Sequence, residues 1–275
     1  MIIFLQVLTV TLVLLLGASL FRLIRERRAL LRDLYSAPQA GPGRVSQEPS
    51  WPEPVARYLA WAGALEGPDI RRARIVQRGE FRTEAKKRWM GFRAEQHVTA
   101  DPFGFVWLAA IGGLIRVSDS FIQGRGRMRA GLLGLMTVVD SQGPDLDRGE
   151  LIRFLSEAPW YPTVLADSRI AWEGLDNYSA KASLSLGPEM AVEGIFHFSG
   201  DGPVMHFSAE RPMDTKNGFV NTPWSAYYYD FRKTGRFMIP RQGRAVWHEK
   251  DGDLEYVRLE IKDATFTNRE DKTKE

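Results

Sequence analysis

The strongest constraint on the fold of this chain is a two-residue alternation of apolar and polar side chains. Between Tyr178 and Leu186 every second residue is apolar, and the residues between them are serine or lysine. Successive side chains of a β-strand point to opposite faces of a sheet, so this alternation predicts strands that bury one face. Strand candidates are 73–82, 86–99, 114–123, 127–140, 169–173, 178–186, 190–198, 204–211, 226–232, 236–239, 244–249 and 254–266. Because they follow one another through Gly, Pro and Asp turns, we expect an antiparallel meander.

Two helices are expected to interrupt the strands. A capping-box pattern that begins at Ser50 predicts a short helix, which Gly63 ends. A second helix is predicted in the middle of the chain, capped by Asp147 and stopped by Pro159. The expected fold class is therefore mainly β (α+β), with a mid-chain helix that caps the sheet, in a domain spanning 51–267. The charged tail 268–275 is expected to follow this domain.

The segment from Met1 to Phe21 carries no charged residue. About 20 such residues in a helix cross the hydrocarbon core of a bilayer, so residues 1–21 are predicted to be a transmembrane anchor. A cleaved signal peptide is the alternative, but no Lys or Arg precedes Arg22. Residues 22–50 are read as a basic flank and a Pro/Gly-rich linker. Positive charge on this side predicts a single-pass protein of the bacterial inner membrane with its domain in the cytoplasm, and a periplasmic domain stays open.

Composition excludes several kinds of site and suggests a partner. The chain has no cysteine, which excludes disulfides, zinc–thiolate sites and cysteine nucleophiles. Residues 22–129 carry 20 Lys and Arg against 11 Asp and Glu, whereas residues 130–275 carry 17 against 23. A basic half beside an anchor favours anionic lipid headgroups near the basic flank. Nucleic acid is not expected, because the basic residues are spread over many strands.

The run from Gly149 to Thr163, GELIRFLSEAPWYPT, resembles the central signature of an uncharacterised bacterial family. Pro223-Trp224 and Ile239-Pro240 fit the same pattern in the same order. The resemblance implies no activity, because the family has none established, and the loop after Thr163 departs from the pattern. In architecture, a meander with one mid-chain helix resembles the curved half-barrel of bacterial lipoprotein carriers. That resemblance implies a sheet that wraps acyl chains, with a helix on its concave side.

Aromatic residues around the mid-chain helix are candidate ligand contacts. They would form the lip of an apolar cavity, although packing of the helix end on the sheet is the plainer interpretation. The candidates are Phe103, Phe105, Trp107, Glu157, Trp160 and Tyr161. The leading hypothesis is a non-enzymatic membrane-anchored module that binds a lipid or another apolar small molecule.

Polar candidates support two alternative functions. His97, Glu157 and Arg211 would serve a membrane-tethered enzyme if they met in one cleft, but no catalytic motif or cofactor site is found. A scaffold that binds a membrane partner is the other alternative. In a symmetric hairpin, His197 and His206 fall opposite each other across a turn, which makes them weak metal candidates. A solvated polar face is the ordinary interpretation of this pair, so no metal is expected.

Overall fold

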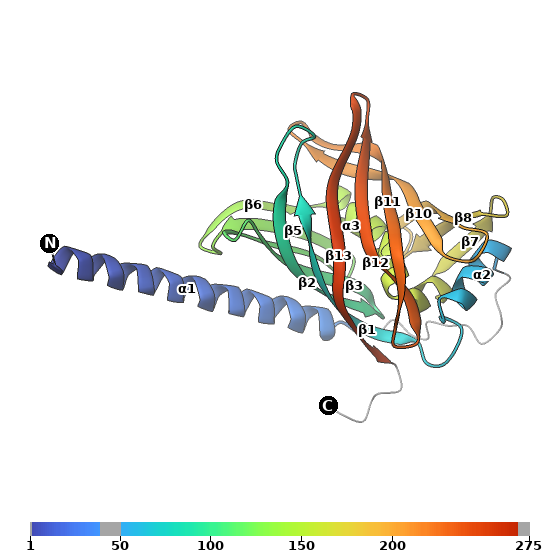
Figure 1. Ribbon diagram of the computed structural model, residues 1–275, viewed down its shortest axis with the longest axis horizontal. Helices are drawn as coiled ribbons and strands as arrows, with labels where there is room; N and C mark the ends of the chain where they lie inside the picture. Colours follow the sequence, from blue (N-terminus) through green and yellow to red (C-terminus); the bar gives the residue numbers. More distant parts are fainter. Residues whose placement is uncertain (1, 39–50, 269–275) are drawn as a thin grey trace.

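The computed structural model describes residues 2–38 and 51–268 (Figure 1). Its helices are α1 Ile2–Tyr35, α2 Glu53–Trp61 and α3 Pro144–Ser156, followed by the short 3-10 helices η1 Ala158–Trp160 and η2 Pro162–Ala166. Its strands are β1 Ile70–Phe81, β2 Met90–Ala100, β3 Phe103–Ile111, β4 Ile115–Ile122, β5 Arg125–Leu132, β6 Met136–Gln142, β7 Ile170–Gly174, β8 Ser179–Ser185, β9 Ala191–Phe198, β10 Val204–Thr215, β11 Gly218–Thr234, β12 Phe237–Glu249 and β13 Gly252–Asn268.

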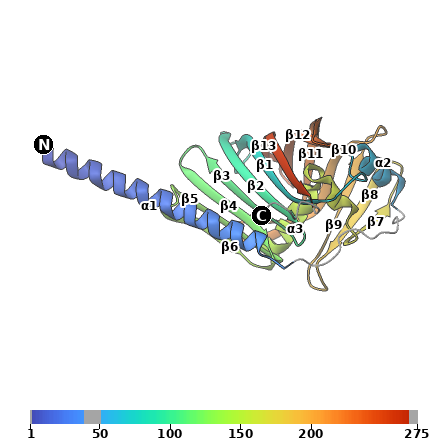
Figure 2. The same cartoon turned by 90° about the horizontal axis from the view of Figure 1, so that it is seen from below.

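The described strands form one 13-stranded antiparallel sheet, in the order β6-β5-β4-β3-β2-β1-β13-β12-β11-β10-β9-β8-β7. Strands that are consecutive in sequence are neighbours in the sheet, except β6 and β7, and the first strand β1 pairs with the last strand β13. The chain therefore has to travel from the edge strand β6 to the edge strand β7. α3 and the two 3-10 helices make this connection across the hollow of the curved sheet (Figures 1 and 2). The predicted mainly β, half-barrel architecture with a mid-chain helix is confirmed.

The two faces of the sheet carry different helices. Gln96 of β2 donates a hydrogen bond to Glu157 at the end of α3, whereas the next residue, His97, contacts Tyr35 of α1. Because side chains alternate along a strand, α3 and α1 lie on opposite faces. We call the face under α3 the inner face and the face under α1 the outer face.

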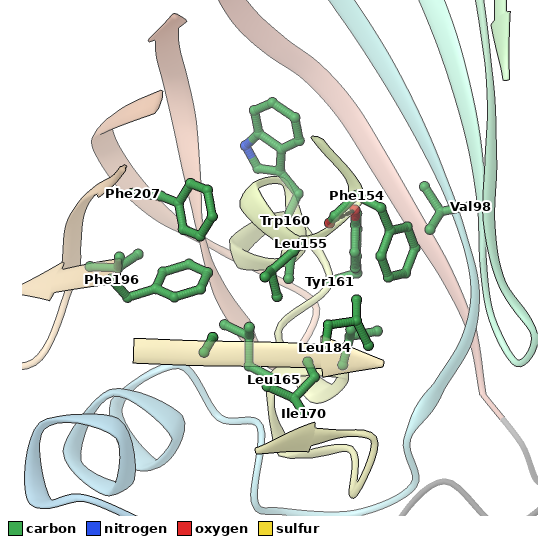
Figure 3. Close-up of a cluster of buried hydrophobic side chains, with 14 of the residues drawn as sticks. Val98, Phe154, Leu155, Trp160, Tyr161, Leu165, Ile170, Leu184, Phe196 and Phe207 are labelled. Carbon is green, nitrogen blue, oxygen red and sulfur yellow. Dashed lines mark hydrogen bonds between the residues drawn. The ribbon is translucent and has the colours of Figure 1, made fainter. Parts of the chain in front are cut away.

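The hydrophobic core fills the space between α3 and the inner face (Figure 3). Phe154 of α3 lies 5.0 Å from Phe103 and 5.5 Å from Tyr161, measured between ring centroids. Phe196 and Phe207 meet at 4.7 Å on the other side of the helix. α2 contributes buried side chains to the same cluster, which makes the described β domain one packed unit.

Three local predictions need comment. Residues 127–140 form two strands and not one, because Leu133 and Gly134 adopt positive φ angles and turn the chain between β5 and β6. α3 starts at Pro144, so Asp147 is not its cap, and its carboxylate accepts a hydrogen bond from the backbone N–H of Gly126 at 2.6 Å. The end of the first helix at Gly63 is confirmed by its left-handed φ of 71°. Ser50, most of the linker and the tail after residue 268 lie outside the described residues.

A helix at the N-terminus is confirmed and runs on through the predicted basic flank to Tyr35. Its first part projects from the domain, and its contacts with the sheet start where the Ser19 hydroxyl donates to the carbonyl of Leu133 (Figure 1). Farther along, Leu34 is buried beside Gly104 of β3. Within residues 2–38 and 51–268, no helix combines the length and apolar character needed to cross a membrane, so the predicted span is not supported.

Candidate functional sites

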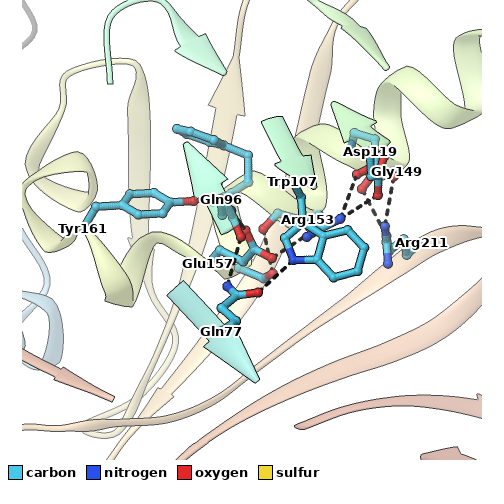
Figure 4. A network of polar contacts seen from close by, with 12 residues as sticks. Gln77, Gln96, Trp107, Asp119, Gly149, Arg153, Glu157, Tyr161 and Arg211 are labelled. Atoms are coloured by element: carbon cyan, nitrogen blue, oxygen red, sulfur yellow. Dashed lines mark hydrogen bonds and ion pairs between the residues drawn. The ribbon is translucent and has the colours of Figure 1, made fainter. Parts of the chain in front are cut away.

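A buried network of charged side chains joins α3 to the inner face (Figure 4). Arg153 follows Glu150 on α3 by three residues, and Glu157 at the end of the helix follows Arg153 by four. This spacing places the three side chains on one side of the helix. The Arg153 guanidinium donates to Glu157 at 2.8 Å and to Asp119 of β4 at 2.6 Å. Arg211 of β10 donates to Glu150 at 3.3 Å and to the carbonyl of Gly149 at 3.0 Å. Charges on two distant strands thus hold the helix in place.

The protonation of this network follows from its burial. Burial raises the pKa of Glu150 to about 8, and the neighbouring charge of Asp119 raises it further. Burial also raises the pKa of Asp119, whereas the positive charge of Arg153 acts to lower it. Arg153 lies between Asp119 and Glu157, and Arg211 pairs with Glu150, so each buried acid of the network has a guanidinium within hydrogen-bond distance. Such pairing is the condition for burying charged groups.

Neutral side chains extend the network across the sheet. The indole N–H of Trp107 donates to Gln77 at 2.8 Å, Gln77 donates to Gln96 at 3.1 Å, and Gln96 donates to Glu157 at 2.5 Å. The chain of bonds runs through β3, β1 and β2 to the C-terminal end of α3. Each carbonyl accepts while its amide donates, so the orientation of the network is fixed. Its evident role is to position α3.

The polar residues predicted from sequence do not meet in one cleft. Glu157 and Arg211 belong to the buried network, but His97 lies on the outer face with Tyr35 and Glu95. Its Nε2 lies 2.7 Å from Glu95, and burial lowers its pKa while Glu95 opposes the shift. The three-residue polar site considered for an enzyme is therefore not formed.

The aromatic candidates are part of the core. Phe103 and Phe105 are buried in the core cluster that also contains α3 side chains. Trp160 and Tyr161 are buried beside α3 (Figure 3), and the Tyr161 hydroxyl donates to the carbonyl of Phe154 at 2.8 Å. Trp107 is half-buried and lies, like Phe105, under the guanidinium of Arg153. Their predicted role at the lip of a cavity stays a prediction, because in this conformation the core packs against them.

The histidine pair forms as expected. His206 lies opposite His197 in the β9–β10 ladder, and their rings stack in parallel with centroids 4.0 Å apart. The register shifts beyond this pair, and Phe198 lies opposite Val204. Burial, reinforced by His197, lowers the pKa of His206 to about 4. Among the described residues no group of three or more His, Asp or Glu side chains is arranged to hold a metal.

A groove on the outer face is a site that the sequence did not reveal. It lies between α1 and strands β1 to β6 and has a volume of about 610 Å³. This is within the range of small-molecule sites, roughly 300–1,000 Å³. We call it the α1 groove. Its apolar lining comes from both walls: Leu23, Val76, Leu108, Ala110 and Met136. Its charged lining comprises Arg22, Glu26, Arg27, Arg74, Arg78, Arg93, Glu95, Arg116, Arg129 and Lys262.

Interactions between α1 and the sheet build the groove. Arg129 of β5 donates to Glu26 of α1 at 2.9 Å, and Arg27 of α1 donates to Glu95 of β2 at 2.8 Å. Arg22 donates to the carbonyl of Leu135, next to the β5–β6 turn. These bonds hold the helix along the outer face and leave the surface beside it open.

Residues 46–259 match the model of a protein family described as a family of unknown function, DUF6544. The chain belongs to the DUF6544 family. This confirms the uncharacterised family expected from the run at 149–163. In the DUF6544 fold seen here, that run forms α3 and the two 3-10 helices, and it supplies Glu150, Arg153 and Glu157 of the buried network.

Two solved structures are similar to this DUF6544 chain. A DUF1329 family protein from Desulfovibrio piger matches with a TM-score of 0.46 and 9% identity, over 78% of this chain and 91% of that one. A LolA superfamily protein from Nitrosomonas europaea matches with a TM-score of 0.39 and 9% identity, over 78% and 94%. None of the curated proteins compared with the chain matches it.

Proposed function

We propose that this DUF6544 protein is a non-enzymatic binding protein that holds the apolar part of a lipid-like ligand in the α1 groove. The observation that carries the proposal is a groove of about 610 Å³ whose walls include Leu23 on α1 and Leu108 and Ala110 on β3. The aliphatic stems of arginines extend this apolar lining, because long basic side chains cover apolar surface and keep their charge in water. The inner face offers less room, since α3 and the core occupy it.

We also propose that the protein works at a lipid surface. Side chains of the projecting part of α1 are apolar and exposed, with Phe4 at 74% and Leu14 at 67%. The β5–β6 turn lies where α1 leaves the domain, because Ser19 of α1 donates to the carbonyl of Leu133. The β3–β4 turn lies beside it, because the N–H of Leu133 donates to the carbonyl of Leu114 at 2.8 Å. Leu114 and Met136, at or beside these turns, are also exposed. Apolar side chains gathered at one end of a molecule are typical of a membrane contact.

Photo-crosslinking tests the groove. The full chain is illuminated with dodecyl maltoside that carries a diazirine in its alkyl chain, and labelled peptides are mapped by mass spectrometry. We expect labels on β3 and on the part of α1 around Leu23. Ala110→Trp fills the groove and should lower this labelling several-fold, whereas Ala171→Trp, at an exposed position of β7, should not. Groove labelling that is absent, or that Ala110→Trp does not reduce, would show that the proposal is wrong.

Flotation with phosphatidylcholine–phosphatidylglycerol vesicles tests the lipid surface. Val10→Asp combined with Leu14→Asp places charge on exposed apolar positions of α1 and should abolish flotation of the full chain. Leu175→Asp makes the same kind of change at an exposed position away from α1 and serves as the control. If the double variant floats as well as the wild type, α1 is not the membrane contact.

A further inference from the structure

The charged lining of the α1 groove is strongly unbalanced. It contains eight basic side chains but only two acidic ones, Glu26 and Glu95. Both acids are already engaged, because Glu95 accepts from Arg27 and Arg74, and Glu26 accepts from Arg129. The remaining positive charge therefore has no acid within the groove to balance it.

Three arginines carry half of this excess. Arg78, Arg93 and Arg116 have no carboxylate within ion-pair distance among the described residues. Arg116 donates only to the backbone carbonyls of Gly113 and Ile115. Lys262, by contrast, lies 2.6 Å from Glu260. Arg78 also lies opposite Glu260 of β13, but Glu260 is already paired with Lys262, so the three guanidiniums remain available to a ligand.

The strand register gathers the three arginines in one row. Arg78 lies directly opposite Arg93, Arg93 lies opposite Ala110, and Ala110 lies opposite Arg116. Residues opposite one another share a face, so all three arginines stand on the outer face at one end of the groove. Like charges directly opposite destabilise a sheet. A bound anion removes this repulsion, and guanidinium groups suit it because they bind phosphate and carboxylate oxygens through paired N–H donors.

The apolar residues lie beside this row. Val76 and Leu108, two residues along their strands from Arg78 and Ala110, flank the row on the same face, and Leu23 of α1 adds to the same wall. A chain that starts at the arginine row can therefore continue between α1 and the sheet. The groove thus has a polar end and an apolar run, which is the pattern of an amphiphile.

We propose that the α1 groove binds an anionic amphiphile, with its phosphate-bearing headgroup on Arg78, Arg93 and Arg116 and its alkyl chain under α1. This proposal rests on the proposed function and adds the chemical class of the ligand. The charge on the arginine row selects the headgroup, and the apolar wall holds the chain without strong selection for its structure. Because the row is exposed, binding weakens as ionic strength rises.

The test compares two diazirine probes with the same alkyl chain, dodecyl phosphate and dodecyl maltoside, on the full-length protein. We expect dodecyl phosphate to label the groove half-maximally at a concentration at least about tenfold lower, as charge-assisted hydrogen bonds predict. Arg93→Gln combined with Arg116→Gln should remove this preference, so that the two probes label the groove half-maximally at similar concentrations. Lys216→Gln combined with Lys250→Gln, which also removes two positive charges but at exposed turns away from the groove, should keep it. Circular dichroism verifies that each variant folds.

The outcomes separate the two proposals. Equal labelling by the two probes in the wild-type protein, or a phosphate preference that survives in the double variant, would refute the headgroup site and leave apolar binding intact. No groove labelling by either probe would refute both proposals. Inorganic phosphate alone is expected to compete only weakly, because it lacks the chain. Full displacement of dodecyl phosphate by equimolar phosphate would overturn the assignment of an amphiphile.

Discussion

The protonation of Glu150 has a measurable consequence for stability. Its carboxyl is buried, one of its oxygens accepts from Arg211 at 3.3 Å, and the other has no hydrogen-bond partner among the described residues. Burial raises its pKa from 4.5 to about 8. Between these two values the folded protein keeps a proton that the unfolded chain has lost. Stability from this group is therefore fully present below pH 4.5 and is lost as pH rises toward 8.

The Glu150→Gln variant removes this dependence with little change of shape. Because the folded wild-type protein binds one proton more than the unfolded chain, its free energy of unfolding falls by about 1.4 kcal/mol for each pH unit. The free energy of unfolding of the variant, relative to wild type, should therefore rise by about 3 kcal/mol from about pH 5 to about pH 7. Other titrating groups are common to both proteins and cancel in the difference.

Urea unfolding followed by tryptophan fluorescence measures this difference at a series of pH values. Glu189→Gln, a substitution of an exposed carboxylate, provides the control and should show no such slope. A difference between Glu150→Gln and wild type that stays constant over the whole range would mean that Glu150 is ionised in the folded protein. The raised pKa of Glu150 would then be wrong.

Three further predictions concern single contacts. Arg153→Gln leaves Asp119 and Glu157 buried without their shared cation and should lower the free energy of unfolding by about 3–5 kcal/mol in urea titrations, whereas a loss below about 1 kcal/mol would contradict the network. Gly194→Ala places a methyl group against the ring of Phe207. It should lower the free energy of unfolding by about 1–3 kcal/mol in the same urea titrations, and an unchanged value would contradict this close packing. The pKa of His206 is lowered to about 4 in the folded protein, so the unfolded chain binds a proton first as pH falls from 6.5 to 4, and stability is lost. His206→Gln should reduce this loss in urea titrations over the same pH range, and an unchanged loss would refute the prediction.

Most of the sheet was predictable because its information is local, but β3 at Phe103–Ile111 was not among the predicted strands. The alternation at 178–186 gives β8 at Ser179–Ser185, and the turn after Phe198 places His197 opposite His206. The prediction was wrong where a contact with a residue far away in the sequence determines the local structure. Asp147 has the composition of a helix cap, but its carboxylate binds the N–H of Gly126, so α3 begins one turn earlier than predicted. The stretch 127–140 was predicted as one strand, but Leu133 and Gly134 turn the chain in its middle; Gly134 was the available turn signal.

The sites were harder to predict than the fold. Glu150 and Arg153 are three residues apart, which is also the spacing of exposed ion pairs on helix surfaces. Only the connection between the sheet edges, which forces α3 across the inner face, shows that these charges are buried. A helix with charged residues on one side and Leu151, Phe154 and Leu155 on the other was the available signal. The α1 groove gave no such signal, because it depends on contacts between Glu26 and Arg129, far apart in sequence.

The topology explains why a binding site would form on the outer face of this fold. A continuous meander of 13 strands has its two edges far apart, and the only described connection between them is the segment that contains α3. That segment fills the hollow of the sheet with core side chains and the buried network. The outer face is left for α1, which contacts it along one line and leaves the strip beside that line open. We propose that the arginines that lack acids in that strip form a binding surface, whereas Arg153 and Arg211 under α3 hold the helix on the sheet.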